Sequence, residues 1–198
     1  SGRERVYTLG QLRYSKWTRR ITLERDRDRY GLPLMRATVR AGVTRALLHQ
    51  RLGLFSGRRD AHWLVEGLTA YVATQSTELD PVAVRVYLLP LVHAWESDSL
   101  LDLADLLTQT TARLANLPAP SRQQVRAQCW SLVRFLLADA ELRQALITHC
   151  RARAAARDPH KPAGSLRGQL SGKAVAGRWR SFVQTVCTDP LRTAARPG

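Results

Sequence analysis

The apolar residues of this chain recur mostly at every third or fourth position, which is the spacing of one face of an α-helix. The clearest case is the segment 33–52, where Pro33 occupies a first-turn position and Val39, Val43 and Leu47 fall on one helical face. Similar spacing and helix-start signals predict further helices along the rest of the chain. These span residues 62–74, 81–96, 99–107, 121–137, 139–157 and 174–187.

Other local patterns interrupt the helical spacing. The stretches 6–9 and 20–24 alternate and are rich in β-branched residues, which predicts two short strands. Pro90 is expected to kink or split its helix, because proline has no N–H to donate inside a helix. Ser121 is expected to act as an N-cap after a Pro-rich break. The Pro- and Gly-rich segment 158–172 is predicted to be a loop.

No break in the pattern is strong enough to separate two hydrophobic cores. The sequence therefore predicts a single, mainly helical domain over residues 1–190, followed by a flexible tail at 191–198. Within the domain we distinguish a strand-containing part at 1–32, a helix pair at 33–76 and a helical C-terminal part at 81–187. The 198 residues are 44% hydrophobic, which suits a globular domain with its own core.

The charge of the chain is high and unevenly distributed. The formal net charge is +15. Residues 1–60 carry 15 basic and 5 acidic residues, residues 61–120 carry 2 and 7, and residues 121–198 carry 14 and 4. A fold that gathers the two basic thirds would present one positive surface to a partner.

Several classes of protein are disfavoured by what the sequence lacks. No run of about 20 apolar residues predicts a membrane span. The three cysteines form no CxxC pair, which argues against a thiolate zinc site, and either free thiols or a Cys150–Cys187 disulfide would fit. The chain contains no Walker loop, GxGxxG or Ser-His-Asp arrangement. Its first residues, Ser1-Gly2 without a Met, suggest a processed or recombinant start.

The segment 62–71, which reads HWLVEGLTAY, carries the most informative motif. It resembles the W-L-x-E-G-L-A-x-Y helix of gluzincin metallopeptidases of the peptidase-MA-like family. Segments 127–136 and 179–183 are similar to later helices of that family, so the resemblance covers residues 18–187. It implies a zincin-like α+β fold that is mainly helical, with a short N-terminal strand region. In that family the Glu at the position of Glu66 is the third zinc ligand.

The upstream segment 39–48 matches the frame of the family's HExxH helix but not its chemistry. Ala41 and Arg45 stand at the two histidine positions, and Gly42 stands at the position of the catalytic glutamate. One remaining carboxylate cannot hold a catalytic zinc, which needs three protein ligands. The resemblance therefore implies a catalytically inactive domain without a cofactor or a small-molecule substrate, acting as a scaffold or protein-interaction module.

The same resemblance predicts how the vacated site is filled. Positions 45 and 66 converge on one metal in the family, so Arg45 and Glu66 are expected to form an ion pair. Tyr71 is either a remnant of a transition-state hydrogen-bond donor or a packing residue. A relocated metal site built from His49, His62 and Glu66 is an alternative that would make the protein a hydrolase.

A polyanion-binding role is a further alternative, because one group of basic residues is little compensated by acidic neighbours. The group comprises Arg151, Arg153, Arg157, Lys161, Arg167, Lys173, Arg178 and Arg180. Such a surface would suit an acidic protein, RNA or an anionic membrane. Because members of the gluzincin family are often exported, the resemblance favours an extracytoplasmic location.

Overall fold

The computed structural model describes residues 12–15, 20–23, 32–54, 62–75, 81–155 and 166–189, and most of these are helical. Two strands come first, β1 (Leu12–Ser15) and β2 (Arg20–Leu23). The helices that follow are α1 (Leu32–Leu52), α2 (His62–Thr74), α3 (Pro81–Glu96), α4 (Leu103–Leu107), α5 (Thr111–Ala115), α6 (Ala119–Ala138), α7 (Ala140–Ala155), α8 (Leu166–Leu170) and α9 (Lys173–Thr188).

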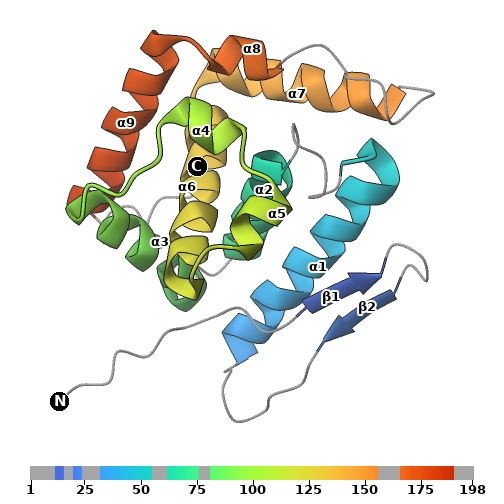
Figure 1. The fold of residues 1–198 in the computed structure, drawn as a ribbon. Coiled ribbons are helices and arrows are strands. Elements are labelled where there is room, and N and C mark those ends of the chain that lie inside the picture. Colours follow the sequence, from blue (N-terminus) through green and yellow to red (C-terminus); the bar gives the residue numbers. More distant parts are fainter. Residues whose placement is uncertain are drawn as a thin grey trace, which may run out of the picture.

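The two strands form an antiparallel pair at one edge of the molecule. Leu12 pairs with Leu23, and the register continues to Ser15 opposite Arg20. The pair lies beside α1, as Figure 1 shows. The predicted strand at 20–24 thus overlaps β2, whereas the one predicted at 6–9 lies outside the described residues.

Helix α6 runs through the middle of the helical body (Figure 1). It packs against α2, α3, α7 and α9, and its side chains from Val125 to Leu136 are almost all buried. Trp130, Leu132 and Leu136 are among the largest fully buried side chains of the described residues. Because apolar side chains surround it on several sides, α6 is the element around which the others are placed.

The α2–α6 contact depends on a glycine. A Cβ atom at Gly67 would lie 2.5 Å from the carbonyl oxygen of Cys129 and 2.6 Å from a methyl carbon of Val133. Both distances are far below van der Waals contact, so no larger residue fits without moving one helix. Gly67 therefore allows the backbones of α2 and α6 to approach closely, which fixes the position of Glu66 next to it.

Buried polar side chains of α6 connect it to other elements. Trp130 Nε1 donates a hydrogen bond to Thr74 Oγ1 of α2 at 3.1 Å. Trp179 Nε1 of α9 donates to Ser131 Oγ at 3.2 Å, and the Leu101 amide donates to Gln128 Oε1 at 2.9 Å. Each of these groups would be costly to bury without a partner, so the bonds help to specify a single packing arrangement.

Most predicted helices are present, but several of their details were wrong. Helix α3 is not split at Pro90, because buried residues on both sides of the proline, such as Tyr87 and Leu91, hold it in place. Helix α6 begins at Ala119, not after a Ser121 cap, since proline is tolerated in a first helical turn. Part of the predicted loop 158–172 forms α8.

The apolar face expected for α1 is not its buried face. Ala37, Ala41 and Leu48 are buried, whereas Val39 and Val43 are exposed on the opposite side. The small residues Ala37 and Ala41 pack against Ala73 of α2, whereas Val39, Val43 and Leu47 remain exposed. The hydrophobic spacing correctly predicted a helix, but it gave the wrong orientation for its core face.

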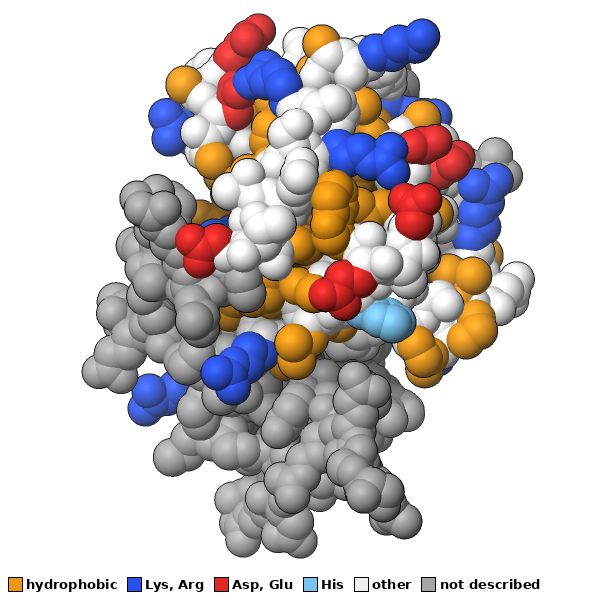
Figure 2. Space-filling model, turned by 90° about the vertical axis from the view of Figure 1, so that its left-hand side faces the viewer, with side chains coloured by type: hydrophobic (Ala, Val, Ile, Leu, Met, Phe, Trp, Pro, Cys, Tyr) orange, Lys and Arg blue, Asp and Glu red, His pale blue; other side chains and the backbone are white. Residues whose placement is uncertain are grey.

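None of the described helices is both long and apolar enough to cross a bilayer. On the face shown in Figure 2, Lys and Arg side chains lie among Asp, Glu and apolar side chains.

The three cysteines are free thiols, so the Cys150–Cys187 disulfide considered from the sequence is not formed.

Candidate functional site

The site lies where α1 packs against α2. Arg40 of α1 donates from Nη2 to the backbone oxygen of Ala73 at 3.1 Å, and Arg45 contacts Glu66 one to two turns further along. The two helices are therefore antiparallel. Ala37 and Ala41 form a small buried cluster with Ala73, and these short side chains let α1 lie close to α2.

Glu66 is a buried carboxylate that accepts a strong hydrogen bond. Arg45 Nη2 donates to Glu66 Oε1 at 2.7 Å, within the range of charge-assisted bonds. This contact confirms the predicted pairing of Arg45 with Glu66. A second arginine, Arg126 of α6, places its Nε 3.6 Å from Glu66 Oε2. One carboxylate on α2 thus faces cations from two different helices.

The three charged groups differ in their access to water. The side chain of Glu66 is 9% exposed, whereas those of Arg45 and Arg126 are 29% and 52% exposed. The two arginines therefore reach the carboxylate from the edge of the interface. A buried carboxylate without a countercharge would be unfavourable, and Arg45 supplies that charge while keeping part of its side chain in water.

Neutral groups complete the surroundings of Glu66. Burial raises the pKa of Tyr87 above its ordinary value, and the nearby Glu66 raises it further. Burial also raises the pKa of the Cys129 thiol, again with a contribution from Glu66. Both groups are neutral at physiological pH. The ring of Tyr87 stacks on Trp130, with the centroids 5.9 Å apart, which connects the site to the core.

The positions that the resemblance aligns with HExxH, Ala41, Gly42 and Arg45, offer no metal ligand next to Glu66. Ala41 and Gly42 are buried next to α2, and Arg45 is occupied by its contact with Glu66. Within the described ranges, no three His, Cys, Asp or Glu side chains come together in a way that could hold a metal ion.

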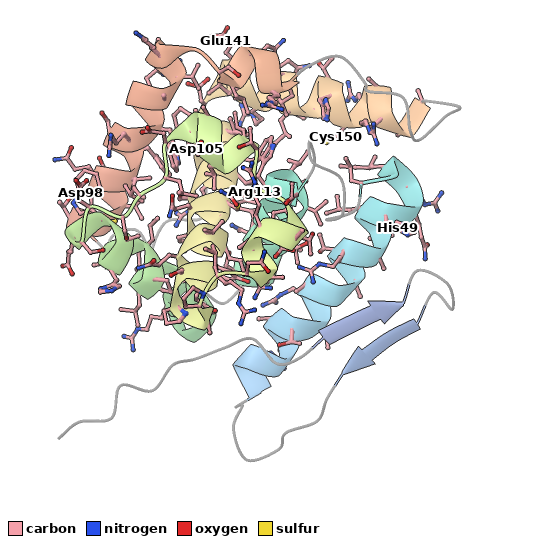
Figure 3. All side chains as sticks on the ribbon, in the orientation of Figure 1. His49, Asp98, Asp105, Arg113, Glu141 and Cys150 are labelled. Atoms are coloured by element: carbon pink, nitrogen blue, oxygen red, sulfur yellow. The ribbon has the colours of Figure 1, made fainter. Side chains whose placement is uncertain are left out.

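The relocated metal site proposed as an alternative is wrong for this reason. His62 is buried at the start of α2, where its Nδ1 lies 3.3 Å from Thr111 Oγ1. His49 lies near the C-terminal end of α1, at the outer edge of the described helices (Figure 3). The structure therefore does not assemble His49, His62 and Glu66 into a ligand set.

Tyr71 is placed as a packing residue. It is half-buried against the hydrophobic core, and its backbone oxygen accepts a hydrogen bond from Thr74. Burial lowers the pKa of the Arg134 guanidinium, and the nearby Tyr71 offsets part of this effect. The Arg134 guanidinium in turn stacks over the Trp130 ring at 4.9 Å. Tyr71 thus contributes to the α2–α6 contact.

The basic residues proposed for anion binding do not act as one free group. Arg153 is buried and donates to the backbone oxygen of Gly53 at 3.3 Å, so it cannot belong to a binding surface. Arg178 forms an ion pair with Asp139, and Arg180 lies 3.8 Å from Asp98. Arg151, Arg167 and Lys173 are exposed, whereas Arg157 and Lys161 lie outside the described residues.

Two residues of the site could not have been found from the sequence motif. Arg126 and Tyr87 belong to α6 and α3, and only tertiary packing brings them near Glu66. Neither residue stands in a segment whose pattern signals a charged site.

No family model, no curated protein and no solved structure matches this chain.

Proposed function

We propose that this protein is a catalytically inactive, gluzincin-like domain that acts as a protein-interaction module for an acidic partner. The observation that carries the proposal is the 2.7 Å ion pair between Arg45 and Glu66 across the α1–α2 interface. In the family that the motifs resemble, these two positions converge on zinc. Here a permanent cation, Arg45, stands opposite the carboxylate and neutralises it.

The chemistry of the site supports an inactive domain. Metal-assisted hydrolysis needs three ligands, an open coordination position and a base that accepts a proton from water. Ala41 and Gly42 supply neither a ligand nor a base, and Arg45 would repel a divalent cation. The neutral Tyr87 and Cys129 beside Glu66 add no negative charge that would attract one.

The proposal also gives a use to the Arg45–Glu66 ion pair, which is costly to bury. A buried ion pair contributes little net stability compared with apolar residues of similar size. Its use here is to hold α1 in one register against α2, so that the outer surface of α1 has a defined shape. The zincin-like fold and the acidic partner belong to this same proposal. The net charge of +15 on the chain favours a negatively charged partner.

Restoring the missing ligands tests the proposed geometry. The Ala41→His/Arg45→His variant would place two histidines at i and i+4, facing Glu66. We expect it to bind one zinc per chain and to give the visible absorption of a tetrahedral site when loaded with cobalt(II). The wild-type protein is expected to carry no stoichiometric zinc, as measured by elemental analysis.

The matched control adds Glu66→Gln to the two histidines, because the amide keeps the size of the side chain but is a poorer ligand. We expect zinc affinity to fall at least about tenfold in this triple variant. Should the double variant unfold, zinc is expected to restore its helical circular dichroism, since a metal that binds only the native state stabilises it. A double variant that neither binds zinc nor refolds with it would contradict the proposed site.

The polyanion-binding alternative predicts a different outcome. Binding of RNA driven by phosphate contacts would weaken steeply as salt is raised, with a slope set by the number of cations involved. Because Arg153 is buried and Arg178 is paired, we expect no tight binding to a single-stranded RNA at physiological salt. Tight binding that weakens with salt would favour the alternative.

A further inference from the structure

The outer face of α1 carries a partly exposed apolar stripe. Val39, Val43 and Leu47 follow one another at intervals of four residues and are 40%, 45% and 50% exposed. Among the described residues the only other large hydrophobic side chain that is so exposed is Leu89 of α3, at 56%. Single exposed aliphatic residues are ordinary, but three in a row along one helix form a surface that suits a partner.

An arginine lies at each end of the stripe along the helix. Arg36 precedes Val39 by three residues, Arg51 follows Leu47 by four, and both arginines are exposed. The sequence of α1 contains no aspartate or glutamate. At 1.5 Å per residue, the distance along the helix from Arg36 to Arg51 is about 22 Å. We call this surface, Arg36–Val39–Val43–Leu47–Arg51, the α1 stripe.

We infer that the α1 stripe is the docking surface for an amphipathic helix of an acidic partner protein, which rests on the interaction role proposed above. The partner helix would cover the three aliphatic side chains with its own apolar residues at three- and four-residue spacing. Acidic residues about four turns apart would pair with Arg36 and Arg51. Such pairing sets the register and direction of the helix more than the affinity.

Two other occupants fit the stripe less well. A second copy of α1 would bring arginine against arginine at both ends of the stripe, whether the helices ran parallel or antiparallel. A lipid surface favours helices with aromatic residues and a lysine- or arginine-rich polar face, and α1 contains no aromatic residue. Val39, Val43 and Leu47 instead form one i±4n ridge, the kind of row of side chains through which packed helices interdigitate.

The test uses two synthetic 18-residue helical peptides that bear a fluorescent label. Both have leucines along one face. The acidic peptide carries glutamates beside them, and the basic peptide has lysine at each of those positions. Fluorescence anisotropy with the full chain at 150 mM salt is expected to give saturable, micromolar binding of the acidic peptide. The basic peptide is expected to bind at least about tenfold more weakly.

Matched variants separate the stripe from the rest of the surface. Val43→Gln/Leu47→Gln is expected to weaken binding of the acidic peptide at least about tenfold, because it removes the apolar contact. Leu89→Gln, which changes an equally exposed leucine on α3, is expected to change affinity less than about twofold. All of these positions are exposed, and circular dichroism would verify that each variant folds.

A second pair of variants tests the charges. Arg36→Gln/Arg51→Gln is expected to weaken binding of the acidic peptide about fivefold and to reduce its salt dependence. Arg143→Gln/Arg151→Gln, an equal loss of charge from exposed positions on α7, is expected to have less than about twofold effect. Equal effects of the two double variants would mean that net charge alone drives binding, which would overturn the inference.

The remaining outcomes also decide the question. No saturable binding of the acidic peptide, or equal binding of both peptides, overturns the inference. Binding to vesicles of phosphatidylcholine and phosphatidylserine that Val43→Gln/Leu47→Gln abolishes would assign the stripe to a lipid surface. A dimer that the same variant dissociates in sedimentation would assign it to a second copy.

The zinc and peptide experiments separate the two proposals. If the two-histidine variant binds zinc but the acidic peptide does not bind the protein, only the docking inference fails. If the peptide binds but the two-histidine variant does not bind zinc, only the gluzincin-like site fails.

Discussion

Helix α2 has two sides that are held in different ways. Towards α6 it packs backbone against backbone at Gly67, and Thr74 accepts a buried hydrogen bond from Trp130. Towards α1 it packs through small side chains such as Ala73, and its one buried carboxylate, Glu66, meets a partly exposed arginine. The first contact depends on close approach of two backbones, and the second adds an ion pair to the packing of small side chains.

The difference shows which contact defines the fold and which defines the site. Close packing in an interior tolerates almost no change of shape, so the α2–α6 contact fixes where α2 lies. An ion pair near the surface tolerates adjustment but fails when one partner is lost. We therefore expect substitutions on the α6 side to destabilise the whole domain, and substitutions on the α1 side to act mainly on the position of α1.

The largest effect is expected for Gly67→Ala. The added Cβ would meet the Cys129 carbonyl oxygen at 2.5 Å, and this backbone atom cannot move without shifting α6. Overpacking of this kind should lower the free energy of unfolding by roughly 3 kcal/mol, measured by urea denaturation. An unchanged midpoint of unfolding would mean that α2 and α6 do not approach each other this closely.

Gly177→Ala is the matched control for that prediction. Gly177 lies inside α9, and a Cβ there would meet nothing within 4 Å. Because glycine is a poor helix former, this substitution should raise the free energy of unfolding by up to about 1 kcal/mol. Equal losses for Gly67→Ala and Gly177→Ala would show that helix propensity, and not the close contact of α2 with α6, decides both results.

A smaller effect is expected from Tyr87 of α3, which is near enough to Glu66 to sense its charge and stacks on Trp130 of α6. Its pKa is raised by burial and by Glu66, so the phenol stays neutral in the folded state above pH 10 but ionises in the unfolded chain. Its contribution to stability is therefore complete below pH 10 and is lost as the pH rises. The free energy of unfolding should fall by up to about 1.4 kcal/mol per pH unit above pH 10.

Tyr87→Phe tests the origin of that slope, since phenylalanine keeps the ring next to Trp130 but has no proton to lose. Urea denaturation of both proteins between pH 10 and 11.5 should give a shallower decline for the variant. Parallel curves would mean that Tyr87 ionises as readily in the folded protein as in the unfolded chain.

The helices were largely predictable because apolar spacing is a local signal. The predictions at 62–74 and 81–96 coincide with α2 and α3. The prediction failed where packing between distant segments decided the outcome. Helix α8 forms in a segment rich in Pro and Gly because Leu166 and Leu170, four residues apart, are both buried. Its five residues are too few to produce a visible periodic pattern.

The site was predictable only in part. The contact of Arg45 with Glu66 followed from the resemblance of two segments to a known helix pair. No motif indicated that Arg126 would approach the same carboxylate or that Arg153 would be buried, because both depend on how α6 and α7 pack. The exposure of Val43 was missed because spacing alone does not say which side of a helix faces the core.

A double-mutant cycle on Arg45 and Glu66 tests the central claim most directly. Arg45→Ala should cost about 2–3 kcal/mol, because it leaves a buried carboxylate with only Arg126 at 3.6 Å. Glu66→Ala should cost less, since Arg45 is 29% exposed and can turn towards water. The account predicts a coupling energy of about 1–2 kcal/mol that is unchanged by a metal chelator. Additive effects within about 0.5 kcal/mol, or a wild-type stability that falls with chelator, would contradict it.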